Sequence, residues 1–431
     1  MTLDFTYKDV FRSVRLGFSP KKIWVAFRGI FYAVILYAIF SYLAFLVSGW
    51  GIKNIWQTYR YIPFPFLNAH LTWYGWILWI VGALFALFYY MVTFTAISKI
   101  TFEQLKGDEF FETKEAWKFA YKNWKGTFLS PIYLSIFIAI LIFVGMLIGL
   151  VGRIPTFGQI IVGIIALPTF AGAFFVVYLT IVLGVILLIA PAIVSTTESD
   201  TFDTLFEGFS VLNDQTWRFF LWEFILMLCA FLAMLVFAIL IKYTLRLSFW
   251  AVGIWQGPRN WWNIMWQNGK WYLYLPFAPT WLLKWFPSIV APAKFISAGM
   301  PKVYPGAATS FGGFLVGLSF YGIAFAILAY GAAIVSAGQT IIYTILVKLK
   351  DDKNLLEKKE ELFEAEEVTV KPEKIEKTEK TKTKRRVTKI APKKKAKKTT
   401  TKKKPKKTTT KKKTTAKKST AKKKTKKTTK K

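Results

Sequence analysis

The sequence predicts an all-α, polytopic membrane helix bundle that ends in a disordered, lysine-rich C-terminal tail. Of the 431 residues, 54% are hydrophobic, and the first 370 are roughly 61% apolar, well above the share in a soluble domain. Apolar runs of about 20 residues, enough for a helix to cross a bilayer, recur along this part. The last 61 residues hold 31 of the 59 Lys and Arg but only 3 of the 24 Asp and Glu.

Residues 1–370 therefore carry 28 basic and 21 acidic side chains, a net charge of +7 out of the total of +35. This distribution excludes an ordinary soluble enzyme and a single basic globular domain. With one cysteine, Cys229, and one histidine, His70, the chain cannot build an internal disulfide framework or a His-rich metal site. Residues 1–20 lack the pattern of a cleaved signal peptide, so we expect the first apolar run to remain as a membrane anchor.

Six transmembrane helices are predicted, at about residues 23–48, 71–97, 127–151, 157–195, 219–242 and 311–346. Ser19 is expected to cap the first of these helices, with Pro20 as its first residue. Pro168 interrupts the fourth, so we interpret residues 157–170 as part of a kinked helix, with a re-entrant segment as the alternative.

A short amphipathic stretch precedes each odd-numbered span, at residues 5–18, 112–124 and 200–212. In the last of them, Phe202, Leu205, Phe206 and Phe209 recur at helical spacing. We interpret these stretches as helices in the plane of the lipid headgroups, although they could simply extend the spans. The predicted architecture is therefore three units, each an interfacial helix followed by a transmembrane hairpin.

Lys and Arg flank the spans unevenly, and this imbalance predicts the orientation. Basic residues are dense before the first span and between the second and third, whereas the loop after span one has only Lys53 and Arg60 and the loop after span three only Arg153. The positive-inside rule then places the N-terminus in the cytoplasm, and six spans return the C-terminus to the same side. We therefore expect a multi-pass protein of the cell (inner) membrane with both termini cytoplasmic.

Residues 243–310 are predicted to form an outer-face loop, which is rich in tryptophan. Eight of the chain's 18 Trp lie between residues 249 and 286, among them Trp261, Trp262, Trp266 and Trp271. Trp favours the membrane–water interface, so these side chains predict interfacial anchoring. The functional alternative is an aromatic platform for a lipid, a glycan or a partner protein.

Arg28 and Glu223 lie inside predicted spans, at similar depth from the cytoplasmic end. Ionisable side chains inside a membrane are costly and are candidates for function. The two could form an intramembrane ion pair, or reach the headgroups separately, or take part in transport or a proton relay. Gln339 and Ser336, in the sixth span, are expected to hydrogen-bond across helices rather than to bind a substrate.

Two G-x-x-x-G motifs, Gly145 with Gly149 and Gly313 with Gly317, predict close helix packing. The sequence contains no phosphate-binding, dinucleotide-binding or nucleophile-elbow motif. We therefore expect no enzymatic activity and no cofactor.

Residues 347–370 carry charges of both signs and predict a juxtamembrane helix. From residue 391 onward only Lys, Thr, Ala, Pro and Ser occur, so the segment 371–431 is expected to be disordered and extended. Its partner should be a polyanion at the cytoplasmic face, either nucleic acid or anionic lipid, although a purely solubilising tail is an alternative. The lysines expected to bind the polyanion are Lys393, Lys394, Lys395, Lys402, Lys403, Lys404, Lys411, Lys412 and Lys413.

Two parts of the chain resemble known proteins. Residues 187–209 (LLIAPAIVSTTESDTFDTLFEGF), with Pro191 near the end of a span and an amphipathic helix from Asp200, resemble one family. It comprises uncharacterised bacterial six-span membrane proteins related to the membrane domain of glycerophosphodiester phosphodiesterases. That resemblance implies a fold but no activity. The tail resembles the lysine-rich tails of linker histones and bacterial histone-like proteins, which implies association with nucleic acid.

Together these features predict a non-enzymatic integral membrane protein whose tail tethers DNA, ribosomal RNA or anionic lipid to the membrane. One alternative is a transporter or channel with a path through the six-helix bundle. Another is a lipid-handling or envelope-assembly protein that acts through the Trp-rich loop.

Overall fold

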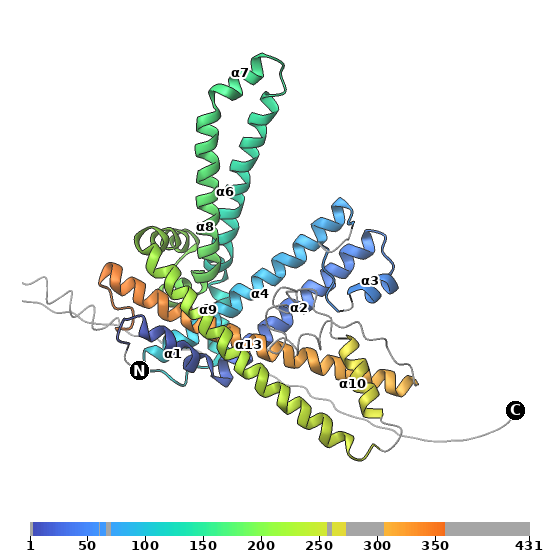
Figure 1. Cartoon of the computed structure of the whole chain (residues 1–431). Helices are drawn as coiled ribbons and strands as arrows, with labels where there is room; N and C mark the ends of the chain where they lie inside the picture. Colours follow the sequence, from blue (N-terminus) through green and yellow to red (C-terminus); the bar gives the residue numbers. More distant parts are fainter. Residues whose placement is uncertain (1–2, 60, 66–69, 257–260, 273–305, 358–431) are drawn as a thin grey trace, which may run out of the picture. The chain divides into compact units, whose positions relative to one another are not determined.

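The computed structural model describes residues 3–59, 61–65, 70–256, 261–272 and 306–357, and within them helices are the regular secondary structure. Six helices are long and apolar enough to cross a membrane (Figure 1). They are α2 (Pro20–Val47), α4 (Trp73–Leu105), α6 (Trp124–Val151), α8 (Ala166–Thr197), α9 (Thr201–Gly253) and α13 (Ala307–Asp351). The predicted all-α membrane fold is confirmed, and the chain is a multi-pass membrane protein.

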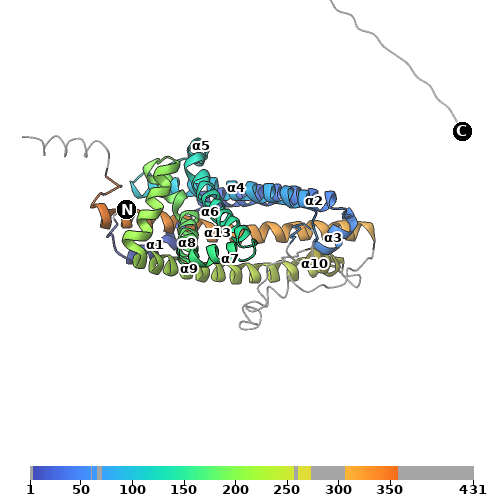
Figure 2. The ribbon, with the colours of Figure 1, turned by 90° about the horizontal axis from the view of Figure 1, so that it is seen from above.

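Within the described residues, five shorter helices lie at the ends of the spanning helices. They are α1 (Lys8–Gly17), α3 (Ile52–Tyr59), α5 (Thr113–Lys122), α7 (Phe157–Ile164) and α10 (Trp261–Tyr272). Helices α1 and α5 lie at one end of the spanning helices and α3 and α10 at the other (Figures 1 and 2). We call these the α1/α5 end and the α3/α10 end.

Polar contacts connect the spanning helices at the α1/α5 end. Lys350 at the end of α13 pairs with Asp214 of α9 at 3.7 Å. The Thr201 hydroxyl at the start of α9 donates to the carbonyl oxygen of Lys125 in α6 at 3.2 Å. Because successive spans alternate in direction, the beginnings of α2, α6 and α9 meet the ends of α4, α8 and α13 here.

The turn between α2 and α4 shows how the sequence ends one helix and begins the next. Thr72, the N-cap residue of α4, accepts a hydrogen bond from the Gly75 amide at 3.4 Å. Its hydroxyl lies 3.1 Å from that of Ser48, which follows the last turn of α2. At the other end of α2, Pro20 is the first helical residue, as predicted, while the Ser19 side chain makes no capping hydrogen bond.

The predicted amphipathic stretches all become helices, and a kink at Gln215 separates the third from the span that follows it. The first two are α1 and α5, whereas the third is the beginning of α9. Gln215 alone interrupts α9, with φ −138° and ψ 36°. Its side-chain amide donates to the Leu346 carbonyl of α13 at 3.2 Å, which fixes the bend against α13.

Several boundaries differ from the predicted ones. Residues 157–195 are not one kinked helix, because α7 ends at Ile164 and α8 begins at Ala166. Pro168 lies in the first turn of α8, where its missing amide hydrogen breaks no helical bond. Helix α9 continues beyond residue 242 to Gly253, so its last turns occupy the predicted loop.

The predicted juxtamembrane helix over 347–370 is wrong for residues 352–357. Helix α13 ends at Asp351, and Asp352 adopts a left-handed conformation with φ 52°. Asn354 Oδ1 then accepts a hydrogen bond from the Leu356 amide at 3.2 Å, and Asn354 Nδ2 donates one to Glu357 Oε1 at 3.0 Å. A left-handed residue followed by such a side-chain turn stops a helix. Residues 358–370 lie outside the described residues.

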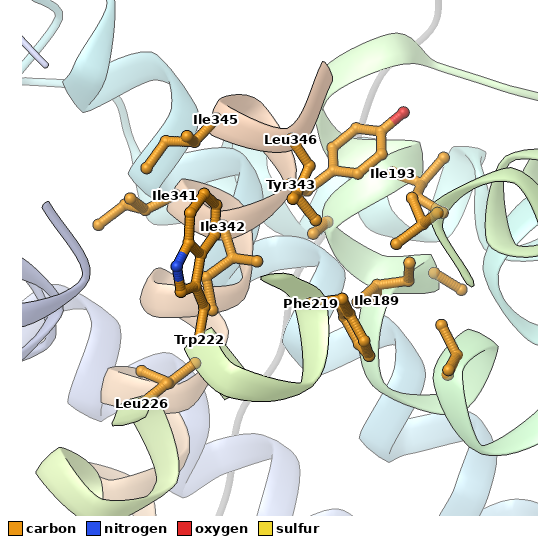
Figure 3. Packing of buried hydrophobic residues seen from close by; sticks show 14 of the residues in the cluster. Ile189, Ile193, Phe219, Trp222, Leu226, Ile341, Ile342, Tyr343, Ile345 and Leu346 are labelled. Atoms are coloured by element: carbon orange, nitrogen blue, oxygen red, sulfur yellow. The ribbon is translucent and has the colours of Figure 1, made fainter. Parts of the chain in front are cut away.

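The largest apolar core lies where α8, α9 and α13 meet (Figure 3). Ile189 of α8, Phe219 and Leu226 of α9, and Ile342 of α13 are at most 1% exposed. Helix α1 covers this core from the α1/α5 end, and its Gly17 lies directly against the backbone of Ile334 in α13. Only a residue without a Cβ permits this approach.

The halves of α6 and α8 that approach α7 present apolar side chains on all sides. Every residue over 142–147 and over 170–175 is exposed. Gly145 and Gly149 lie in or beside this region, and a Cβ built on either would meet no atom within 4 Å. The packing predicted for this G-x-x-x-G motif is therefore not made within the described chain. A lipid environment suits such a surface.

The second G-x-x-x-G motif packs as predicted. A Cβ on Gly313 would lie 2.5 Å from the Cβ of Asn268, and one on Gly317 would lie 2.7 Å from the Cβ of Tyr272. Both partners belong to α10, which therefore rests on α13 through two glycines one turn apart.

Candidate functional site: a buried polar cluster and a basic surface

A carboxylic side chain is buried among the spanning helices. Glu223 of α9 is 6% exposed, and Gln339 of α13 is 1% exposed. The Gln339 amide nitrogen donates to Glu223 Oε1 at 3.2 Å. Two long helices thus place a carboxyl and an amide side by side in an apolar part of the bundle.

The pair retains two acceptor atoms without a donor. Among the described residues, neither Glu223 Oε2 nor Gln339 Oε1 has a hydrogen-bond partner. Tyr90 of α4 is close enough to interact electrostatically with Glu223. Its own hydroxyl donates instead to the Leu187 carbonyl of α8 at 3.3 Å. The site therefore offers oxygen lone pairs in excess of the hydrogens available to them.

Apolar packing encloses the cluster closely. Leu226, one turn from Glu223, presses its side chain against Gly338, the neighbour of Gln339. Figure 3 shows Trp222 and Leu226 of α9 in the same buried apolar cluster as Ile341 and Ile342 of α13. A charge in such surroundings is poorly solvated, which raises the cost of an ionised Glu223.

Ser336 lies one turn before Gln339 and joins α13 to α4. Its hydroxyl lies 3.0 Å from the Ser98 hydroxyl and is also 3.0 Å from the Phe94 carbonyl, to which it donates. Both serines are fully buried. The prediction that Gln339 and Ser336 hydrogen-bond across helices is confirmed.

The structure does not bring Arg28 and Glu223 together. Arg28 is exposed, and its guanidinium lies 5.9 Å from the centre of the Trp117 ring of α5. No ion pair involving Arg28 occurs within the described part of the chain. The reason is that α2 and α9 both pack on α13, which supplies Gln339 as the partner of Glu223.

Helix α5 presents a row of lysines at the α1/α5 end. Lys114, Lys118 and Lys122 recur every four residues, so they share one helix face, and all three are exposed. None of them forms an ion pair with another described residue. Trp117 and Tyr121 stack beside the row, with ring centres 5.6 Å apart. Burial raises the pKa of the Tyr121 hydroxyl, so it stays neutral beside these cations.

Lys99 was expected only as part of the basic flank, yet it joins two spanning helices. It is 9% exposed and pairs with Glu103 at 3.0 Å and with Glu198 beyond the end of α8 at 3.6 Å. Its ammonium also lies 4.4 Å from the centre of the Phe119 ring. The four-residue spacing of Lys99 and Glu103 could have predicted their ion pair from the sequence. Nothing in the sequence predicts the contact of Lys99 with Glu198.

The tryptophans of α10 are buried to different extents, and Trp266 packs into the protein. Trp266 is 6% exposed, with ring centres 5.1 Å from Phe249 and 4.9 Å from Phe320. The Trp262 ring nitrogen donates to the Phe249 carbonyl at 3.2 Å. Trp261 and Trp271 are half-buried. Helix α10 therefore packs on α13 at the glycines of α13 and contacts the extension of α9 through Trp262.

The nine lysines of the predicted polyanion-binding tail lie outside the described residues. Among the described residues, no three His, Cys, Asp or Glu side chains gather as metal ligands would. Comparison of the chain with models of protein families, with curated proteins and with solved structures finds no match.

Proposed function

We propose that this chain is a protein of the cell's inner membrane that holds a polyanion, preferably nucleic acid, at the cytoplasmic face. The observation that carries the proposal is where α13 ends. Its last residues lie at the α1/α5 end, next to Asp214 and Gln215 of α9. The lysine-rich segment 371–431 follows only about 20 residues later in the chain. Helix α13 therefore ends at the end of the bundle that presents unpaired lysines on α5, and the tail follows it in the sequence.

The orientation follows from the distribution of basic residues. The α1/α5 end carries the basic residues of α1, of α5 and of the ends of α4 and α13. Lys53 and Arg153 lie in the links at the other ends of the α2–α4 and α6–α8 hairpins. Lys and Arg in short segments favour the cytoplasmic side. We therefore assign the α1/α5 end, with both chain termini, to the cytoplasm.

The tail's composition defines the chemistry of its partner. A net charge of +28 on 61 residues attracts a polyanion by releasing the counterions condensed on it. No aromatic residue follows Phe363, so the tail cannot stack on bases, and its binding should not depend on base sequence. Fully extended, the segment reaches at most about 200 Å. DNA or ribosomal RNA fits this description best, and anionic lipid is the second choice.

The test compares the full chain with two variants, purified from native membranes that are equilibrated at each salt concentration before mild crosslinking. One variant ends at residue 370. The other retains the tail and replaces Lys114, Lys118 and Lys122 with Gln. Nucleic acid and anionic lipid are quantified in each preparation at about 50 and 200 mM salt. A protein that contacts 6–10 phosphates should lose about 10³–10⁵ in affinity over this range.

We expect nucleic acid with the full chain and with the Lys→Gln variant, and its loss from both at the higher salt. The truncated chain should carry almost none. Equal, negligible nucleic acid in all three preparations would overturn the proposal. If anionic lipid co-purifies only with the chains that retain the tail, and nucleic acid co-purifies with none, the tail binds the membrane surface instead.

A further inference from the structure

We propose that Glu223 and Gln339 form an intramembrane binding site for one monovalent cation. The cation is either a proton carried by the Glu223 carboxyl or a sodium ion held between the side-chain oxygens. This inference is independent of the tail, because both residues lie in spanning helices of the body.

The first argument is that Glu223 forms no ion pair with any described residue. The basic side chains within or at the start of the spanning helices near the same end of the bundle have other contacts. Arg28 lies over Trp117, and Lys99 pairs with Glu103 and Glu198. Lys22, which is fully buried, donates to the Leu16 carbonyl at 3.0 Å. A carboxylate buried without a cation is strongly disfavoured, so the site must acquire positive charge.

The two side chains that interact with Glu223 from the packed helices are neutral. Helix α13 contributes Gln339, and α4 contributes Tyr90. The part of α8 that packs against α9 contributes apolar side chains such as Ile189. On α1, Arg12 already pairs with Asp9 at 2.8 Å. On α9 itself, Arg218 is exposed, five residues away along the helix.

The second argument is the pair of acceptors that lack a donor. Glu223 Oε2 and Gln339 Oε1 are both buried, and neither has a hydrogen-bond partner among the described residues. An unpaired buried acceptor is costly, because its lost hydrogen bonds to water are not replaced. A proton on the carboxyl supplies a donor, and a sodium ion accepts lone pairs from carboxylate and amide oxygens alike. One bound cation would therefore neutralise the Glu223 carboxylate and also give the unpaired oxygens of Glu223 and Gln339 a partner.

A hydrophobic carbodiimide tests the site directly. The O–H of a protonated carboxyl adds across one C=N bond of dicyclohexylcarbodiimide, and migration of the acyl group to nitrogen gives a stable N-acylurea. All atoms of both reactants remain in the adduct, so mass spectrometry locates it. The full chain is labelled in lipid nanodiscs from pH 6 to pH 9, in choline chloride or in sodium chloride at equal ionic strength. Glu223→Gln is the negative control, and exposed Glu115→Gln is the matched control.

We expect an adduct on Glu223 at pH 6 in choline that falls at least tenfold by pH 9. The adduct should be absent from Glu223→Gln and unchanged in Glu115→Gln. If sodium chloride reduces the labelling several-fold at constant pH, the resident ion is sodium. If sodium has no effect, the resident ion is the proton.

A thermal melting experiment tests the proposal even if the carbodiimide cannot reach Glu223. Ionising Glu223 without a partner costs free energy, so the thermal midpoint of the wild-type chain should fall by several degrees from pH 6 to pH 9 in choline. Glu223→Gln, which cannot ionise, should not show this fall, whereas Glu115→Gln should. Sodium should restore the wild-type midpoint at pH 9 only if it binds. A wild-type chain without an adduct, whose pH profile matches that of Glu223→Gln, would overturn the proposal.

Discussion

The two G-x-x-x-G motifs are alike in sequence, but only one packs against another helix of the chain. We predict that Gly313→Ala and Gly317→Ala destabilise the packing of α10, while Gly145→Ala and Gly149→Ala do not. A Cβ at Gly317 would lie 2.7 Å from the Cβ of Tyr272 and 3.2 Å from the Gly269 carbonyl. These atoms belong to or adjoin the backbone, so relief requires α10 to move by about 1 Å rather than a side chain to rotate.

Overpacking of this kind costs about 1–3 kcal/mol per site. At about 2 kcal/mol, local opening of α10 becomes roughly 30-fold more populated, because 1.4 kcal/mol is a factor of ten. At the open positions, Ala is the better helix former by about 1 kcal/mol, so the control variants should be unchanged or slightly more stable.

Hydrogen–deuterium exchange of peptides covering residues 261–272, in lipid nanodiscs, measures the effect where it arises. Equal exchange in Gly317→Ala and Gly145→Ala would refute the reasoning, because it would show that α10 does not depend on close approach to α13.

Three further predictions concern single contacts. Lys99→Met should lower the free energy of unfolding by about 1 kcal/mol, because the carboxylates that it pairs with, Glu103 and Glu198, both remain partly exposed to solvent; thermal melting of the variant, with Glu103→Gln as a partial rescue, measures this loss. A double-mutant cycle of Ser98→Ala and Ser336→Ala should give a coupling of about 0.6 kcal/mol, and a coupling of zero would contradict the hydrogen bond between α4 and α13. Tyr61→Phe should leave the melting midpoint unchanged or slightly higher at neutral pH, because the buried hydroxyl has no partner among the described residues. Burial raises the pKa of Tyr61 above its usual value, so above about pH 10 the wild-type chain should lose stability that the variant keeps.

The candidate site shows where reasoning from the sequence reached its limit. That Glu223 lies inside a span could be read from the apolar residues around it. Its partner could not, because the rotation of one helix relative to another is set by packing along their whole length. Arg28 matched Glu223 in charge and depth, yet it lies over Trp117 instead. Lys99 was the converse case, since its contact with Glu198 joins residues about 100 positions apart.

The predicted helix boundaries were wrong where an apolar run continued past the true end of a helix or where charged residues interrupted one. The apolar run from residue 157 continued past Pro168, and only the separation of α7 from α8 shows that it is two helices. In α9 the helix runs on through Arg246 to Gly253, because apolar residues surround each charge.

The sequence by itself determined the six spanning helices, the amphipathic stretches beside them and the concentration of charge in the last 61 residues. These properties depend on composition and on spacing along one helix, which neighbours cannot change. Tertiary structure alone decided that Gln339 meets Glu223, that Trp266 is buried and that Gly313 packs while Gly145 does not. Each of these depends on which faces of distant helices meet, and that choice is made by the fit of many side chains at once.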